Sequence, residues 1–503
     1  MKFLLLRVIF TLFVLFVLGG APTFADGGAI DQSRSGIVYW FTPTANMVQR
    51  TYRAEGDYTL VTQESLAAYS SGGFVTGNVS RLVPTSWPTP PGALFYQGTA
   101  QFSTFAPLAM VHVETVTPRW NTLSGSNRAN DYSPLIYTAR IANWTGSTLW
   151  FPFFAYGYDD TTTKITIQHV DTLQMDKIAS LRIRAYTQNA VPTVDVIRTA
   201  GFNSPYAFTG ADIGLNFGWN GSIRVDATYS GDSRLRISGI ARSFSLNHRW
   251  GNAYEGQANP SGRYVVPVRC GEGYDTNIYI QSASSATVWQ PIIQWYDSSG
   301  NPFDNWFISD AALYSGTRLR RSACSSTGNY AFMGYAAVYT WDQYYDALPI
   351  AVMAEQIHTS GSRETVIGFG IPAEGVQKHW SVPFARWSND QVHLRTEIQI
   401  INPALGSTDA HVQIKYYKGN GSQQGNTINE DIYPHASYFT DPGDVTAGGV
   451  FGYYSEAGGP GGAIDITSDQ PIMVFARAYR YAGDGTILLS EGFSGVPMGL
   501  GYD

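Results

Sequence analysis

The sequence is poor in the residues that carry most enzyme chemistry. It has two cysteines and eight histidines in 503 residues, and charged residues make up 14 % of it. It contains no His-Glu-x-x-His, Cys-x-x-Cys, Gly-x-Ser-x-Gly or Gly-x-x-x-x-Gly-Lys stretch, which are common signatures of zinc peptidases, redox centres, serine hydrolases and nucleotide-binding loops. His411 and His435 do not pair at metal-ligand spacing, and we expect them on strand or loop surfaces in water. We therefore predict no catalysis and no required cofactor.

Long hydrophobic stretches are also missing, except at the N-terminus. Lys2 and Arg7 supply a positive end, a mostly apolar run of 11 residues covers 8–18, and Thr23-Phe24-Ala25 matches a small-x-Ala cleavage site. Such a run is too short to span a bilayer. We predict a cleaved signal peptide at 1–25, a linker at 26–32, and no membrane insertion after cleavage.

Positive charge is scarce in the chain that remains. Without residues 1–25 it has 30 Lys and Arg against 39 Asp and Glu, a formal net charge of −9. That balance argues against nucleic acid and anionic membranes as partners. Aromatic residues, by contrast, make up 14 % of the sequence, which suits β-sheets and also suits contact with glycans.

What the chain does contain is a repeat with a spacing close to 121 residues. Copies of its closing stretch begin at Phe105, Gly231, Asp346 and Ser468. A period this long corresponds to one small domain instead of a helical or propeller repeat. The predicted units are 33–130, 131–260, 261–376 and 377–503. The last two match each other well, the second is divergent, and the first is short and divergent.

Alternation at period two indicates strands. In residues 180–186, Leu181, Ile183 and Ala185 share one face and the arginines share the other. Gly-rich turn signals separate such runs, and amphipathic helical windows are almost absent. The predicted fold is all-β, with four tandem antiparallel β-sandwich domains of immunoglobulin-like size after the signal peptide. A jelly roll in each unit is the alternative.

The third and fourth units carry a resemblance. The fourth reads Ile398-Gln399-Ile400-Ile401-Asn402, then Val412-Gln413-Ile414-Lys415-Tyr416, then a closing Gly461 to Pro471 stretch. In this it resembles the tandem immunoglobulin-like β-sandwich repeats of secreted and cell-surface bacterial proteins. The third unit keeps these strands, but it has Trp341 to Asp346 where the fourth has Ser468-Asp469 before the last proline. The resemblance covers about 240 residues well. It implies extracellular modules without catalysis and assigns no functional residues.

Cys270 and Cys324 both fall in the third unit. In an exported protein such a pair usually forms a disulfide, which we predict here. Since the other units lack cysteine, the fold does not depend on it. Asp159, Asp160 and Asp297 are weak candidates for calcium ligands, because calcium prefers carboxylate oxygens in loops. Turn chemistry explains these acids equally well.

The best ligand-binding candidate is an aromatic insertion in the third unit. It contains Trp341, Asp342, Tyr344 and Tyr345. Aromatic rings stack on sugar faces, and a nearby carboxylate accepts sugar hydroxyls. The plainer interpretation is a loop whose aromatic residues cover the sandwich edge.

Three functions follow in order of preference. The first is an extracellular structural, surface-assembly or adhesion protein, secreted and cell-surface associated, which contacts itself or other surface proteins. Open sandwich edges make such strand-to-strand contacts available. The second is a carbohydrate-binding protein that uses the aromatic insertion on a polysaccharide. The third is a glycoside hydrolase with its site at a domain junction; the repeat argues against it.

Overall fold

The computed structural model describes residues 33–54, 58–75, 98–104, 106, 108–116, 133–138, 145–171, 173–202, 205–230, 233–245, 251–303, 307–308, 312–341, 347–360, 363–370, 375–388, 395–403, 408–446, 449–452, 462–481 and 487–498. Antiparallel sheets dominate, so the all-β prediction is confirmed. The helical turns in these ranges are η3 Ala211–Ile213, α3 Ala323–Ser326 and α4 Gly443–Thr446. No helix in these ranges is long and apolar enough to cross a membrane.

The first segment, residues 33–138, has two sheets. One has the order β4-β1-β6-β7 and ends in a pair of consecutive strands; we call it the hairpin sheet. The other, the partner sheet, has the order β3-β2-β5. The strands are β1 Ser33–Phe41, β2 Asn46–Ala54, β3 Tyr58–Leu66, β4 Ser71–Val75, β5 Gly98–Thr104, β6 Ala109–Val116 and β7 Ser133–Thr138. β7 starts beyond residue 130, yet it pairs with β6 and so extends the first segment.

In the second segment, residues 148–255, a single nine-stranded sheet replaces the two separate sheets. Its order is β11-β10-β13-β8-β9-β15-β16, with β12 on β9 and β14 on β13. The strands are β8 Thr148–Tyr158, β9 Thr161–His169, β10 Ala179–Tyr186, β11 Val194–Ala200, β12 Tyr206–Phe208, β13 Trp219–Tyr229, β14 Ser233–Arg234, β15 Ile237–Ser245 and β16 Gly251–Glu255. In β10, Leu181 and Ile183 are buried and Arg182 is exposed, which confirms the alternation predicted there.

The third segment, residues 263–370, has a hairpin sheet of order β21-β18-β23-β24 and a partner sheet of order β17-β22-β19-β20. The strands are β17 Arg263–Cys270, β18 Tyr274–Ser282, β19 Trp289–Asp297, β20 Phe307–Ile308, β21 Arg318–Ser322, β22 Phe332–Trp341, β23 Ile350–Ser360 and β24 Arg363–Gly370. The two sheets enclose part of the largest apolar core, including Ile278, Ile293 and Trp295.

In the fourth segment, residues 377–497, the 20-residue strand β30 belongs to both sheets. Its first half lies in the partner sheet β28-β27-β30-β25-β32, and its second half pairs with β26 and β31, with β29 beside β26. The strands are β25 Gln377–Val382, β26 Arg395–Ile401, β27 Ala410–Lys418, β28 Gln423–Ile432, β29 Ser437–Thr440, β30 Gly462–Tyr481, β31 Ile487–Ser494 and β32 Val496–Pro497.

The sequence repeat is preserved in the strand register. Ile278 of β18 lies opposite Ala354 of β23, and Ile398 of β26 lies opposite Ala476 of β30. Each segment also closes with a hairpin: β6–β7, β15–β16, β23–β24 and β30–β31. The repeated stretches of the sequence are therefore the same strands of one recurring plan. Whether each segment is an independent domain stays a prediction.

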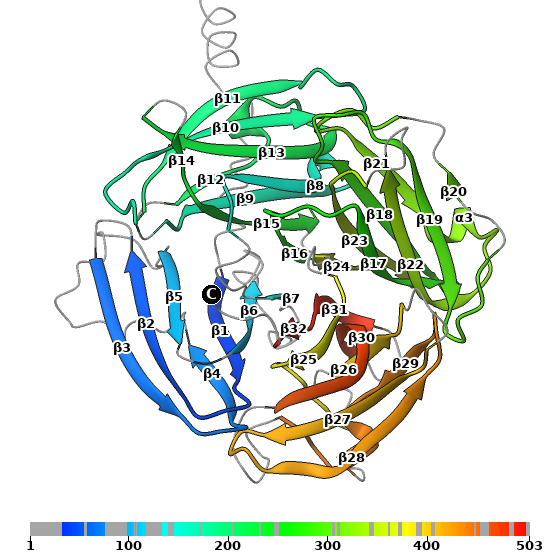
Figure 1. The fold of residues 1–503 in the computed structure, drawn as a ribbon. Helices are drawn as coiled ribbons and strands as arrows, with labels where there is room; N and C mark the ends of the chain where they lie inside the picture. The colour runs from blue at the N-terminus through cyan, green and yellow to red at the C-terminus, as the bar shows by residue number, and fades with distance from the viewer. Residues whose placement is uncertain are drawn as a thin grey trace, which may run out of the picture.

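The four segments close into a ring (Figure 1). The last strands of the hairpins lie toward its middle, where β16 contacts β7 and β24, and β31 contacts β24 and β7. At the ring's closing point, Phe41 of the first segment stacks on Tyr417 of the fourth at 5.5 Å between ring centroids. The backbone N–H of Ser71 also donates to the carbonyl oxygen of Gly419 at 3.4 Å. The tandem units thus fold back on one another instead of forming an open string.

Because neighbouring segments pack together, many strands are covered on both faces. β18 is buried at all positions but Asp275. Its polar Gln281 is buried against the second segment and donates to the carbonyl oxygen of Ile223 at 3.1 Å. Gln399 of β26 likewise donates to the carbonyl oxygen of Gly334 in the third segment at 2.7 Å. Hydrogen bonds across the junctions therefore satisfy side chains that alternation alone assigns to a solvent face.

Two charged residues at the same position of the repeat lie in these junctions. Arg477 of β30 is fully buried and bonds Gln356 at 3.0 Å, Gln399 at 2.7 Å and Glu397 at 3.2 Å. Glu355 of β23, 4 % exposed, accepts from Tyr279 at 2.8 Å and from Asn252 at 3.3 Å. Arg477 joins the third and fourth segments, and Glu355 joins the second and third.

Candidate functional site

The predicted aromatic insertion lies largely outside the described residues. Asp342, Tyr344 and Tyr345 are among those not described. For Trp341 only the backbone is described: it ends β22, opposite Trp289 of β19. Sugar binding by this loop therefore stays a prediction.

The calcium candidates occupy tight turns. Asp159 and Asp160 connect β8 to β9 with φ values of 47° and 59°, a left-handed conformation that suits a two-residue hairpin and that Asp tolerates. Asp297 directs its carboxylate into its own turn, where it accepts from the backbone N–H of Ser299 and Asn301, each at 2.9 Å. Within the described ranges no three His, Cys, Asp or Glu residues cluster as metal ligands. Calcium binding stays a prediction.

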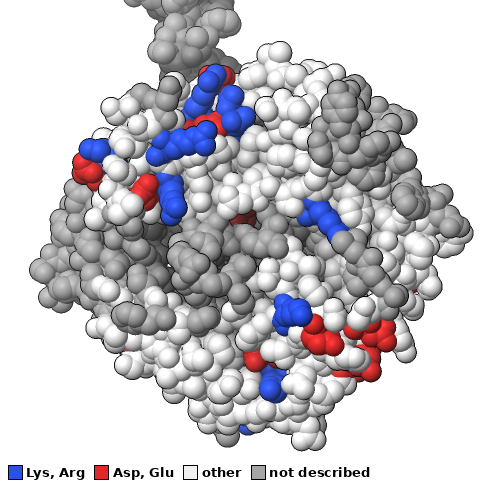
Figure 2. Space-filling view, viewed as in Figure 1, with Lys and Arg blue, Asp and Glu red and all other residues white. Residues whose placement is uncertain are grey.

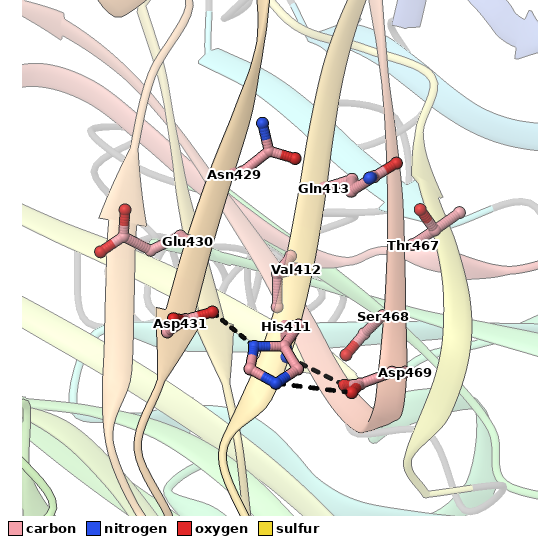
Figure 3. Close-up of a pocket in the computed structure, with 9 residues that line it drawn as sticks. All are labelled: His411, Val412, Gln413, Asn429, Glu430, Asp431, Thr467, Ser468 and Asp469. Carbon is pink, nitrogen blue, oxygen red and sulfur yellow. Dashed lines mark hydrogen bonds and ion pairs between the residues drawn. The ribbon is translucent and has the colours of Figure 1, made fainter.

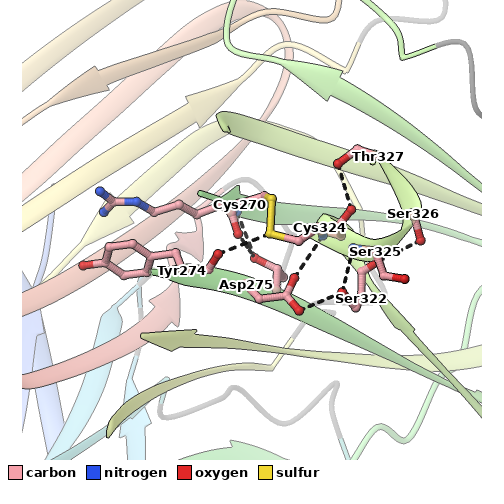
Figure 4. The surroundings of a disulfide bond; sticks show 11 residues. Cys270, Tyr274, Asp275, Ser322, Cys324, Ser325, Ser326 and Thr327 are labelled. Atoms are coloured by element: carbon pink, nitrogen blue, oxygen red, sulfur yellow. Dashed lines mark hydrogen bonds between the residues drawn. A yellow bond between two sulfur atoms is a disulfide. The ribbon is translucent and has the colours of Figure 1, made fainter. Parts of the chain in front are cut away.

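The disulfide joins Cys270 to Cys324, the pairing predicted from the sequence (Figure 4). Cys270 ends β17, and Cys324 lies in the single turn α3. Ser322 caps that turn by accepting from the backbone N–H of Ser325 at 3.0 Å. The carboxylate of Asp275 accepts from the Ser322 hydroxyl at 2.7 Å and from the backbone N–H of Cys324 at 3.0 Å. A local network therefore holds Cys324 in place.

A polar surface hollow in the partner sheet of the fourth segment is the candidate site (Figure 3). Its volume is about 330 Å³, and β27, β28 and β30 line it. Antiparallel register places Asp431 and His411 opposite each other, and the backbone N–H of His411 donates to Asp469 at 2.9 Å. The next row holds Asn429, Gln413 and Thr467 on the same face. Only this register brings together three stretches that are far apart in the sequence.

His411 lies between two carboxylates. Its Nδ1 is 2.5 Å from Oδ1 of Asp431, and its Nε2 is 3.9 Å from Oδ2 of Asp469. The hydrogen bond with Asp431, aided by the negative charges of both aspartates, raises the pKa of His411 above its usual value. The side chain is 64 % exposed, as expected from the sequence. With two carboxylates beside one imidazole, the hollow stays net negative even when His411 is protonated.

His435 differs from the expectation of a solvated residue. It stacks on Tyr296 at 4.6 Å between ring centroids, and its Nδ1 is 2.9 Å from the hydroxyl of Tyr335. Both tyrosines belong to the third segment, so His435 is a junction residue. Burial lowers its pKa, which favours the neutral imidazole.

The nine-stranded sheet of the second segment carries a basic patch on β10 and β13. Arg182 and Arg184 of β10 and Arg224 of β13 form it. Arg182 bonds Asp195 at 2.8 Å, and Arg224 bonds Asp226 at 2.8 Å; Arg184 also pairs with Asp226. Burial acts to raise the pKa of Asp226, but the hydrogen bonds and charges of the two arginines outweigh it and lower the pKa. Three guanidinium groups against two carboxylates leave the patch net positive.

Figure 2 shows how these charges are distributed on one face of the molecule. Lys and Arg gather at the top of the view, where Figure 1 places β10, β11 and β13. Asp and Glu gather at the lower right, near the end of β28. We call these the basic patch and the acidic hollow. In strand order, β27 corresponds to β10, so both lie on equivalent strands of the repeat.

Comparison with known proteins gives no family. No family model and no curated protein matches the chain. One similar solved structure is a tetra-tandem repeat in the extending region of a large adhesion protein, at 11 % identity and a TM-score of 0.10, covering 93 % of this chain and 97 % of that one. Another is the BSP domain of a biofilm-associated protein, at 9 % identity and a TM-score of 0.13, covering 93 % and 91 %. Both TM-scores are too low to carry fold or function over to this chain.

Proposed function

We propose that the protein is an extracellular, non-catalytic structural protein that acts in assembly or adhesion at the cell surface. The observation that carries this proposal is the closed ring of repeated segments, in which β7, β16, β24 and β31 meet. Strands covered on both faces, with hydrogen bonds across the junctions, make a stiff body. A stiff body of repeats suits a spacer or platform better than a hinged enzyme cleft.

Two further features support the proposal. The disulfide between Cys270 and Cys324 suits an oxidising, exported environment. The basic patch and the acidic hollow place charged side chains on partly exposed sheet faces, where they are available to a macromolecular partner. Neither feature requires a bound cofactor.

Surface labelling of intact cells tests the location. Cells that produce the full chain are treated with a membrane-impermeant biotin reagent, and the labelled fraction is compared with that of a chain lacking residues 2–25. We expect the full chain to be labelled and the shortened chain to stay protected inside. Equal protection of both chains would refute a surface role.

A further inference from the structure

Two oppositely charged surfaces of this protein lie on one face. The acidic hollow presents Asp431 and Asp469 on either side of His411, and the basic patch presents Arg182, Arg184 and Arg224. The side chains of Asp431 and Asp469 are 66 % and 47 % exposed, and that of Arg182 is 54 % exposed. Both surfaces can therefore be reached from solvent without unfolding any strand.

The two surfaces also match in chemistry. A guanidinium offers five N–H donors, so Arg182 retains donors beyond the two that bond Asp195. A carboxylate accepts at several lone pairs, so Asp431 can bond an arginine while it holds His411. The two predicted units that carry these surfaces also differ in charge. Residues 377–503 have 13 Asp and Glu against 7 Lys and Arg, whereas residues 131–260 have 10 Asp and Glu against 11 Lys and Arg.

We propose that a second copy of this chain is the partner of both surfaces, with the acidic hollow of each copy docked on the basic patch of the other. The inference rests on the proposed assembly function and names its contact. Both surfaces lie on one face (Figure 2). A two-fold axis in the plane of that face therefore places the acidic hollow of each copy against the basic patch of the other. A two-fold contact of this kind is self-complementary and closes at two copies.

Electrostatics sets the expected behaviour of the pair. The whole chain is negative, so two copies repel at long range and attract only where the patches meet. Screening at higher ionic strength weakens charge pairs at exposed positions. Dimerisation should therefore weaken as NaCl is raised, and reversing the charge of one patch should weaken it by about ten-fold or more.

Light scattering of purified residues 26–503 after size exclusion tests the contact. The wild type is compared with Asp431→Lys/Asp469→Lys, with Arg182→Glu/Arg184→Glu, and with the control Asp176→Lys/Glu272→Lys, which changes exposed acids elsewhere by the same +4 as the first variant. Thermal midpoints verify that all four chains are folded. We expect a salt-sensitive dimer for the wild type and the control, and monomers for each patch variant alone.

Mixing the two patch variants provides the decisive result. Each contact then pairs Lys with Glu or Arg with Asp, so the mixture should recover the dimer mass. A monomeric wild type, patch variants that dimerise like the wild type, a mixture that stays monomeric, or a mass that grows beyond two copies would each overturn the inference. None of these results affects surface labelling. A failure of the dimer contact can therefore be distinguished from a failure of the proposed function.

Discussion

Two junctions of the molecule place a charged side chain at the same position of the repeat. Arg477, between the third and fourth segments, is charged at every physiological pH and bonds three side chains. Glu355, between the second and third segments, titrates. Burial raises its pKa, although hydrogen bonds from Tyr279 and Asn252 and the nearby Arg320 and Arg318 act to lower it. This position of the repeat holds a polar side chain that bonds across the junction. The residues around that side chain determine whether it stays charged.

Replacing Arg477 should have the largest effect on the free energy of unfolding. Arg477→Met leaves Gln356 and Gln399 buried without their partner and should lower the free energy of unfolding by about 3–5 kcal/mol. Arg182→Met is the matched control: Arg182 is exposed in a surface ion pair, so its loss should cost less than about 1 kcal/mol. Urea unfolding followed by tryptophan fluorescence measures both. Similar values for the two variants would contradict the role assigned to Arg477.

Removing the disulfide should loosen both junctions together, because the third segment belongs to both. Cys270→Ser with Cys324→Ser frees a loop closed by cysteines 54 positions apart. The expected loss is roughly 2–4 kcal/mol, with the unfolded chain gaining conformational entropy. Calorimetry with and without reductant checks this: reductant should destabilise the wild type and leave the double variant unchanged.

A turn glycine tests the third-to-fourth junction without touching its charge. Gly300 has φ +88°, and a Cβ there would lie 2.7 Å from the carbonyl oxygen of Pro434. Gly300→Ala should cost about 1–3 kcal/mol from strain and crowding. Gly328→Ala shares the positive φ but has no neighbour closer than 3.7 Å, so it reports the strain alone. If the two variants unfold at the same urea concentration, the junction contact contributes nothing.

The pH dependence sharpens the contrast between the junctions. Since the folded protein binds a proton at Glu355 more readily than the unfolded chain, this group stabilises the fold at low pH. That contribution is lost as pH rises from the usual Glu pKa through the raised one, by at most about 1.4 kcal/mol per pH unit. Glu355→Gln should remove this slope from the free energy of unfolding, measured by urea unfolding between pH 4 and 8. An unchanged slope would show that Glu355 ionises freely in the fold.

The smallest effect should come from outside both junctions. Asp431→Asn removes the hydrogen-bonded carboxylate that raises the pKa of His411, so the pKa should fall toward 6.5. Because the pair is exposed, global stability should hardly change. Titration of the His411 ring protons by NMR follows this shift. Asp159→Asn, a change on a distant turn, should leave the His411 pKa where it is.

Much of the fold could be predicted from single strands. Alternation in β10 identified Leu181 and Ile183 as core residues, and the spacing of the repeat placed the closing strands. Gln281 and Gln399 look like solvent-facing residues in the same patterns, yet both are buried. Period-two alternation distinguishes the two faces of a strand, but it carries no information on a second sheet that covers the polar face.

The candidate site shows the same limit. His411 was expected on the surface and is there, but its two carboxylate neighbours come from strands whose pairing only the register reveals. Asp469 belongs to the closing Gly461 to Pro471 stretch, which reads as structural because it carries the resemblance to the tandem repeats. A site made from a structural stretch and two neighbouring strands leaves no compact motif in the sequence.

Closure of the ring has a consequence for how the chain is made. Phe41 belongs to the first of the four segments, and Tyr417, on which it stacks, leaves the ribosome 376 residues later. Until then Phe41, which is fully buried in the finished ring, lacks its aromatic cover. A chain that stops short of the fourth segment would keep an apolar surface of the kind that chaperones and quality-control proteases recognise. The fourth segment therefore covers an apolar surface that the first segment presents until the ring closes.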